Sequence, residues 1–147
     1  MIMEPLRVPA RLESLGTIGA YVLQAAEAGG IEKRAAYRLR LAVDEIATNI
    51  ILHGRPGEHG EEILIVKASI DDESVSIVLE DCGAAFNPLE KEEPIDLGRP
   101  MEERQIGGLG VFLAIRGVDR FHYDRIDGIN RNTLVVHRRP SETAPPR

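Results

Sequence analysis

A carboxylate and an amide lie one helical turn apart in the first third of the chain. Glu45 and Asn49 are four residues apart in the stretch 43–49, VDEIATN, so in a helix both side chains project from one face. A carboxylate and an amide oxygen placed side by side can hold a hard cation and orient a water or a hydroxyl group. An exposed helix face with a local hydrogen bond has the same spacing, so this pair alone leaves both interpretations open.

A second polar patch follows an apolar run in the stretch 79–88, LEDCGAAFNP. Asp81, at the end of a predicted strand, is suited to accept a hydrogen bond from an exocyclic amine. Gly83 allows a flat ring to approach the backbone closely, because it has no Cβ. Aspartate and glycine are also residues that commonly end a strand in a turn, so a plain turn is the alternative interpretation.

The third patch is the glycine-rich stretch 106–112, IGGLGVF, which opens a predicted helix. Backbone N–H groups at a helix start lack intrahelical acceptors and form an anion site; here the site would consist of Gly107, Gly108, Leu109 and Gly110. A flexible hinge is the alternative. The stretch is not a Walker P-loop, because no Gly-Lys-Ser/Thr follows, and not a dinucleotide fingerprint, because no strand of a βαβ unit precedes it.

Hydrophobic spacing indicates the elements that position these patches. It predicts helices over 11–28, 32–53 and 110–118. Apolar runs bounded by turn residues predict strands over 6–8, 63–70, 75–79, 121–123 and 133–137. A turn at Asp127-Gly128 joins the last two strands. The order predicts an α+β two-layer sandwich, in which about three helices cover one face of a mixed, mostly antiparallel sheet.

The composition is that of one globular domain. The chain has 147 residues, 43% apolar and 29% charged, and we expect a single domain over 1–140 followed by a disordered tail over 141–147. The formal net charge of -6 argues against nucleic acid as a partner. A single cysteine excludes an intrachain disulfide. No apolar run has membrane-spanning length, and no signal peptide is recognisable, so we expect a cytoplasmic protein without membrane contact.

Taken in order, the three patches resemble the N, G1 and G2 boxes of the GHKL ATPases, the superfamily with the Bergerat ATP-binding fold. Four stretches are similar to its anti-sigma-factor serine/threonine kinase branch: LRLAVDEIATNIILHG, DCGAAFNP, IGGLGVFLAIRGVD and DGINRNTLVV. The resemblance extends from Leu6 to Arg138. It implies a histidine-kinase-like ATPase domain that binds ATP and Mg²⁺.

The resemblance also implies roles for single residues. Glu45 would be the general base that activates the substrate hydroxyl, and Asn49 would ligate the Mg²⁺ that bridges the ATP phosphates. Asp81 would bind the adenine amine, and Gly83 would leave room for the ring. Thr133, on the last predicted strand, would support adenine through a water.

At the phosphate end, the resemblance implies that Gly107, Gly108, Leu109 and Gly110 close over the phosphates through their N–H groups. The segment 87–106 would be the ATP lid. Some members of the branch carry an arginine directly before the glycine run. Here the sequence reads ERQI, so Arg104 would reach the terminal phosphate only if the lid moves it inward. We expect Cys82 to be a bystander buried beside the nucleotide.

The leading hypothesis is an ATP-dependent serine/threonine protein kinase that acts as an anti-sigma factor. It would phosphorylate a small STAS-domain anti-sigma-factor antagonist, bind a sigma factor when free of that antagonist, and form a homodimer. One alternative is a non-catalytic switch that senses ATP or ADP, against which Glu45 argues, because a pure binder needs no base. Another is a free-standing histidine-kinase catalytic domain, which the EIATN form of the first box disfavours.

Overall fold

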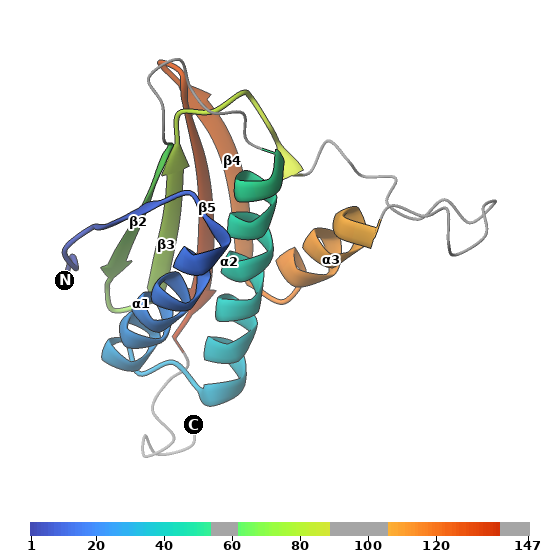
Figure 1. Cartoon of the computed structure of the whole chain (residues 1–147). Helices are drawn as coiled ribbons and strands as arrows, with labels where there is room; N and C mark the ends of the chain where they lie inside the picture. Colours follow the sequence, from blue (N-terminus) through green and yellow to red (C-terminus); the bar gives the residue numbers. More distant parts are fainter. Residues whose placement is uncertain (54–61, 89–105, 139–147) are drawn as a thin grey trace, which may run out of the picture.

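The computed structural model has two layers, a five-stranded sheet and a layer of helices (Figure 1). It describes residues 1–53, 62–88 and 106–138, so the predicted tail over 141–147 and most of the predicted lid lie outside the described residues. In chain order the elements are β1 (Leu6–Pro9), a 3-10 turn (Leu12–Ser14), α1 (Leu15–Ala28), α2 (Lys33–His53), β2 (Ile63–Ile70), β3 (Ser74–Asp81), α3 (Ile106–Ile115), β4 (Arg120–Ile126) and β5 (Ile129–His137).

The strands lie in the order β1-β2-β3-β5-β4, and every neighbouring pair is antiparallel. The predicted α+β sandwich is therefore confirmed, while its sheet is antiparallel throughout rather than mixed. Tight turns explain the pairing of β2 with β3 and of β4 with β5. Asp71 accepts backbone hydrogen bonds from Glu73 and Ser74 at the β2–β3 turn. Asp127 and Gly128, with φ of 53° and 78°, form the β4–β5 turn, in the conformation that matches strand twist.

The core lies between the inner face of the sheet and the helices α1 and α2 (Figure 1). Side chains alternate between the faces of a strand, and the inner positions of β2 and β5 are buried while the outer ones are more exposed. Leu39, Val43 and Ile46 recur at helical spacing along α2 and form part of this core. The largest fully buried apolar side chains are Ile18, Leu39, Ile46, Leu64, Ile77, Leu79 and Leu134.

Several element boundaries differ from the sequence prediction, and three of them change the predicted patches. Strand β3 continues to Asp81, β5 begins at Ile129, and α3 begins at Ile106. In both strands the additional residues are mostly polar, which lowers strand propensity. They pair nevertheless, because Asp81 lies opposite Asn130 in the register and the two side chains hydrogen-bond to each other. The extension brings the predicted adenine-binding carboxylate into the sheet.

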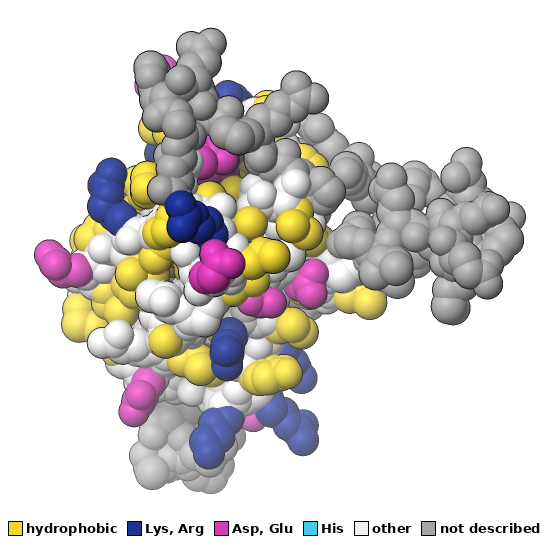
Figure 2. Space-filling view, in the orientation of Figure 1, with side chains coloured by type: hydrophobic (Ala, Val, Ile, Leu, Met, Phe, Trp, Pro, Cys, Tyr) yellow, Lys and Arg dark blue, Asp and Glu magenta, His cyan; other side chains and the backbone are white. Residues whose placement is uncertain are grey.

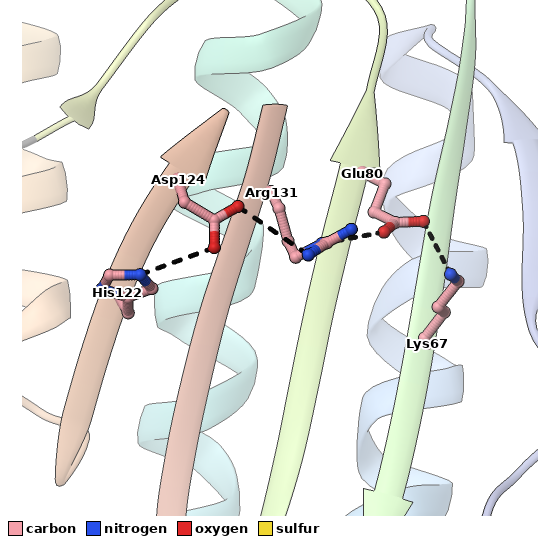
Figure 3. Close-up of polar contacts among 5 residues, drawn as sticks. All are labelled: Lys67, Glu80, His122, Asp124 and Arg131. Atoms are coloured by element: carbon pink, nitrogen blue, oxygen red, sulfur yellow. Dashed lines mark hydrogen bonds and ion pairs between the residues drawn. The ribbon is translucent and has the colours of Figure 1, made fainter. Parts of the chain in front are cut away.

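The outer face of the sheet carries a row of charged side chains from four strands (Figure 3). Glu80 lies between Lys67 and Arg131, with N–O distances of 2.8 and 3.0 Å. Arg131 also approaches Asp124, which is 3.5 Å from His122. Burial opposes ionisation of Glu80, but hydrogen bonds from Lys67 and Arg131 outweigh it and lower the pKa of this carboxyl. This row therefore links β2, β3, β5 and β4 on the side away from the helices.

Candidate functional site

The first predicted pair lies on α2, at the border between the core and solvent. Asn49 is 9% exposed and Glu45 is half-buried. They are four positions apart in the helix, so they occupy neighbouring positions on one side of α2. No described residue hydrogen-bonds the Asn49 amide, although a buried polar group is normally paired.

Glu45 also lies against α3, which brings the first and third patches together. A Cβ added to Gly110 would be 2.7 Å from Oε2 of Glu45, so only glycine leaves this carboxylate its present position. Desolvation, and secondly the charge of Asp44, raise the pKa of Glu45. A carboxylate with a raised pKa is a stronger base than an exposed glutamate, as general-base catalysis requires.

The glycine run forms the beginning of α3, since this helix starts at Ile106 and not at the predicted Gly110. The backbone of Gly107, Gly108 and Leu109 therefore lies within the first helical turn. The first four N–H groups of a helix have no intrahelical acceptor. The expected anion site at a helix start is consistent with this backbone, whereas Arg104 lies outside the described residues.

Asp81 ends β3 on the inner face of the sheet and is 5% exposed. Its Oδ1 accepts hydrogen bonds from the Gly83 N–H at 2.9 Å and from Asn130 Nδ2 at 3.1 Å. No donor among the described residues reaches Oδ2. One carboxylate oxygen is therefore saturated, while the other retains its capacity to accept.

Asn130 is the residue of this site that the sequence analysis missed. Its Nδ2 also donates to the carbonyls of Gly83 and Ala84, at 3.3 and 2.9 Å. Its Oδ1 accepts from Arg125 Nη1 at 2.9 Å and from the Tyr123 hydroxyl. An asparagine five residues after an arginine carries no signal of such a role in sequence. Only the β3–β5 register, which places it opposite Asp81, reveals it.

Glu62, which precedes β2, is a second carboxylate beside Asp81. Burial, and secondly the charge of Asp81, raise the pKa of Glu62. Its buried Oε1 has no hydrogen-bond partner among the described residues. A Cβ on Gly83 would be 2.6 Å from that oxygen and 3.1 Å from Oδ1 of Asp81. Gly83 thus provides close approach here to two carboxylates, a constraint that the sequence analysis did not foresee.

The register corrects the prediction for Thr133. This residue pairs with Val78 and His122 on the outer face of the sheet, away from the helices. The inward position next to it belongs to Asn132, which is 1% exposed and whose Oδ1 has no hydrogen-bond partner in the described part of the chain. Successive side chains of a strand point to opposite faces of the sheet. Asn132, one residue before Thr133, therefore has the inward position that the prediction gave to Thr133.

Two other features of the surface, an exposed cysteine and a shallow hollow, lie apart from these patches. Cys82 is exposed, which corrects the expectation that it is buried. A shallow hollow of about 250 Å³ on α2 is lined by Tyr37, Arg40, Leu41 and Asp44, and it includes none of the predicted site residues.

The described part of the chain contains no group of three or more His, Cys, Asp or Glu side chains placed to hold a metal ion. None of the described helices is long and apolar enough to cross a membrane. Figure 2 shows charged and apolar side chains interspersed over the helical face.

Comparisons with a family model and with known protein sequences indicate the same family. The sequence model of the histidine kinase-like ATPase domain matches residues 8–137. Serine-protein kinase RsbW of Listeria monocytogenes is 33% identical over 146 residues, covering 95% of this chain and 91% of its own. Serine/threonine-protein kinase BtrW of Bordetella bronchiseptica is 33% identical over 107 residues, covering 73% of this chain and 74% of its own.

Solved structures share the fold at low sequence identity. The RsbU and RsbW domains of a Mycobacterium tuberculosis protein match with a TM-score of 0.63 and 17% identity, covering 95% of this chain and 34% of that one. The histidine kinase domain of a blue-light activated kinase from Erythrobacter litoralis matches with a TM-score of 0.53 and 17% identity, covering 88% of this chain and 61% of that one. The fold prediction is thereby confirmed, and the similar curated proteins are protein kinases, as expected for an enzyme of this type.

Proposed function

Since the chain belongs to the histidine kinase-like ATPase domain family, whose similar members are serine and serine/threonine kinases, we propose how its site works. It transfers the γ-phosphoryl group of ATP to a serine or threonine of a small STAS-domain protein in the cytoplasm. That protein is an antagonist of an anti-sigma factor, and the kinase itself binds a sigma factor and acts as a homodimer. The observation that carries the proposal is the Glu45 carboxylate lying against Gly110 of α3.

At the base end of the site, Asp81 accepts a hydrogen bond from the exocyclic amine of adenine. Its Oδ2 serves this purpose because Oδ1 is already occupied by Gly83 and Asn130. A carboxylate oxygen with no proton rejects the carbonyl that guanine carries at the same position. The buried Oδ1 of Asn132, to which no described residue donates, is the inward polar atom nearest in sequence to the predicted Thr133 position.

At the phosphate end, the residues fit a hard cation and a reacting hydroxyl. The amide of Asn49, which no described residue hydrogen-bonds, offers one neutral oxygen ligand, and the phosphates supply the remaining charged ones. Mg²⁺, when bound, neutralises charge on the phosphates and orients them. N–H groups in the first turn of α3 bind phosphate oxygens. Glu45 accepts the proton of the substrate hydroxyl, and positioning of this kind is most of what phosphoryl transfer demands.

The test uses the purified protein with labelled ATP, Mg²⁺ and STAS-domain proteins from the same genome. We expect transfer to one of them, with the label stable to acid, as phosphoserine and phosphothreonine are. Glu45→Gln abolishes the transfer while leaving ATP affinity within a few-fold, because it removes the base and keeps the shape. Intact ATP binding with no transfer to any STAS protein would contradict the kinase proposal and leave a nucleotide-sensing switch. An acid-labile label would indicate phosphohistidine instead.

A further inference from the structure

We propose that Asn130 is a positioning residue for adenine recognition. It fixes one oxygen of Asp81 and the turn that follows, so that the other oxygen faces the exocyclic amine of the base. The inference rests on the proposed ATP site and adds a residue to it. It starts from a buried amide whose hydrogen-bonding groups all have partners.

The orientation of the Asn130 amide is determined by its neighbours. Arg125 is a donor without acceptor capacity, and its Nη1 lies 2.9 Å from the side-chain oxygen of Asn130. The Tyr123 hydroxyl bonds to the same oxygen and itself accepts the Phe86 N–H at 3.3 Å. Nδ2 must therefore point the other way, towards Asp81 and the carbonyls of the turn.

This arrangement restricts the rotation of the Asp81 carboxylate. Rotation about its terminal bond would break the hydrogen bonds from both Asn130 and the Gly83 N–H. Asn130 is 2% exposed, so water cannot readily replace the lost partner. The turn is held as well, because Arg125 and Asn130 both donate to the Gly83 carbonyl. Asn130 thus determines which acceptor a bound base meets.

The experiment compares two nucleotides by calorimetry: ATP, and purine riboside triphosphate, which lacks the exocyclic amine. We expect the wild type to bind ATP about 10-fold or more tightly than the analogue, since a hydrogen bond to a charged group is at stake. Asn130→Ala should reduce that preference to less than about three-fold while leaving affinity for the analogue unchanged. Asp81→Asn should reduce the preference for ATP in the same way. The double variant should show no further loss of this preference.

A second variant covers the case in which Asn130→Ala does not fold. Asn130→Asp keeps an oxygen for Arg125 and Tyr123, but it replaces the donor to Asp81 by a second carboxylate, and it should also lose the preference. Ser76→Ala, on the outer face of β3, is the matched control and should retain it.

Two kinds of result would contradict the positioning role of Asn130 or the ATP site on which it rests. A variant at Asn130 that keeps the wild-type preference, or that weakens both nucleotides equally, would overturn the positioning role, because equal weakening is what loss of a purely structural contact produces. A wild type that binds neither nucleotide would contradict the proposed ATP site itself. The two failures are therefore distinguishable.

Discussion

Burial and one neighbouring charge determine the environment of the proposed base. Glu45 is partly desolvated between α2 and α3, and Asp44 lies next to it in the chain. Both effects favour the protonated carboxyl and raise its pKa above the ordinary value of 4.5. A base must be ionised to accept a proton, so activity depends on this pKa.

The first prediction concerns the pH dependence of kinase activity. As pH falls through the raised pKa of Glu45, the base becomes protonated and kcat/KM falls, so the acidic limb of the profile lies above 4.5. Asp44→Asn removes the smaller of the two causes and should move this limb to lower pH with the alkaline plateau unchanged. A limb that stays in place in Asp44→Asn would contradict the electrostatic contribution.

Gly110 gives a second prediction at this scale. In Gly110→Ala the new Cβ would lie 2.7 Å from Oε2 of Glu45. This flexible carboxylate can move away, so we expect little loss of stability but a fall in phosphotransfer of about 10- to 100-fold, because the base is displaced. Gly16→Ala is the control, since nothing lies within 4 Å of its added Cβ. Urea unfolding and a transfer assay on both variants check the two halves of the prediction.

Among the elements, the strands β2, β3, β5 and β4 are connected by side chains on their outer face. Glu80 bonds to Lys67 on one side and to Arg131 on the other. The pKa of Glu80 in the folded protein is lower than in the unfolded chain. Its stabilising contribution is therefore fully present above about 4.5 and is lost as pH falls through the lower folded-state pKa.

We predict that the free energy of unfolding of Glu80→Gln depends less on pH in the acidic range than that of the wild type. At neutral pH this variant should unfold about 1 kcal/mol more easily than the wild type, since charge-assisted hydrogen bonds are weakened. The difference should shrink on acidification, because the wild type loses the same contribution. Urea titrations at several pH values measure it, with Asp72→Asn in the exposed β2–β3 turn as control. A constant difference across pH would refute the assignment.

Regular elements were predictable where their signal is local. The periodicity of α2 and the alternation of β2 depend on neighbouring residues, and both elements were predicted within one residue of their ends. The ends of β3 and β5 were not, because the polar residues there are held by partners some fifty positions away, as Asn130 is by Asp81. The same cause explains Thr133 and Asn132, whose faces depend on the register of β5.

At the scale of the molecule, the proposed site joins the two layers of the fold. Glu45, Asn49 and Gly110 belong to helices, whereas Asp81 and Asn130 belong to the sheet. The order of the three patches could be identified from sequence. The contact between α2 and α3 and the network around Asp81 could not, because they arise only when distant segments pack together.

A ligand that contacts both layers should stabilise the whole fold. At about 100 times its Kd, ATP contributes about 2.7 kcal/mol to the free energy of unfolding, and we expect the Tm to rise by several degrees. Mg²⁺ should enlarge the rise in the wild type but not in Asn49→Ala, which lacks the proposed ligand. Thermal scans with and without EDTA measure this. A variant whose Tm still responds to Mg²⁺ would remove Asn49 from the metal site.

The pairing of Asp81 with Asn130 spans the connection between β3 and α3. A chain divided there would yield one fragment with the carboxylate and another with the amide that orients it. Neither fragment alone would hold the complete pocket that we propose for adenine. Recombining them would restore recognition only after β3 and β5 pair, so the divided chain would serve as a reporter that couples fragment reassembly to nucleotide capture.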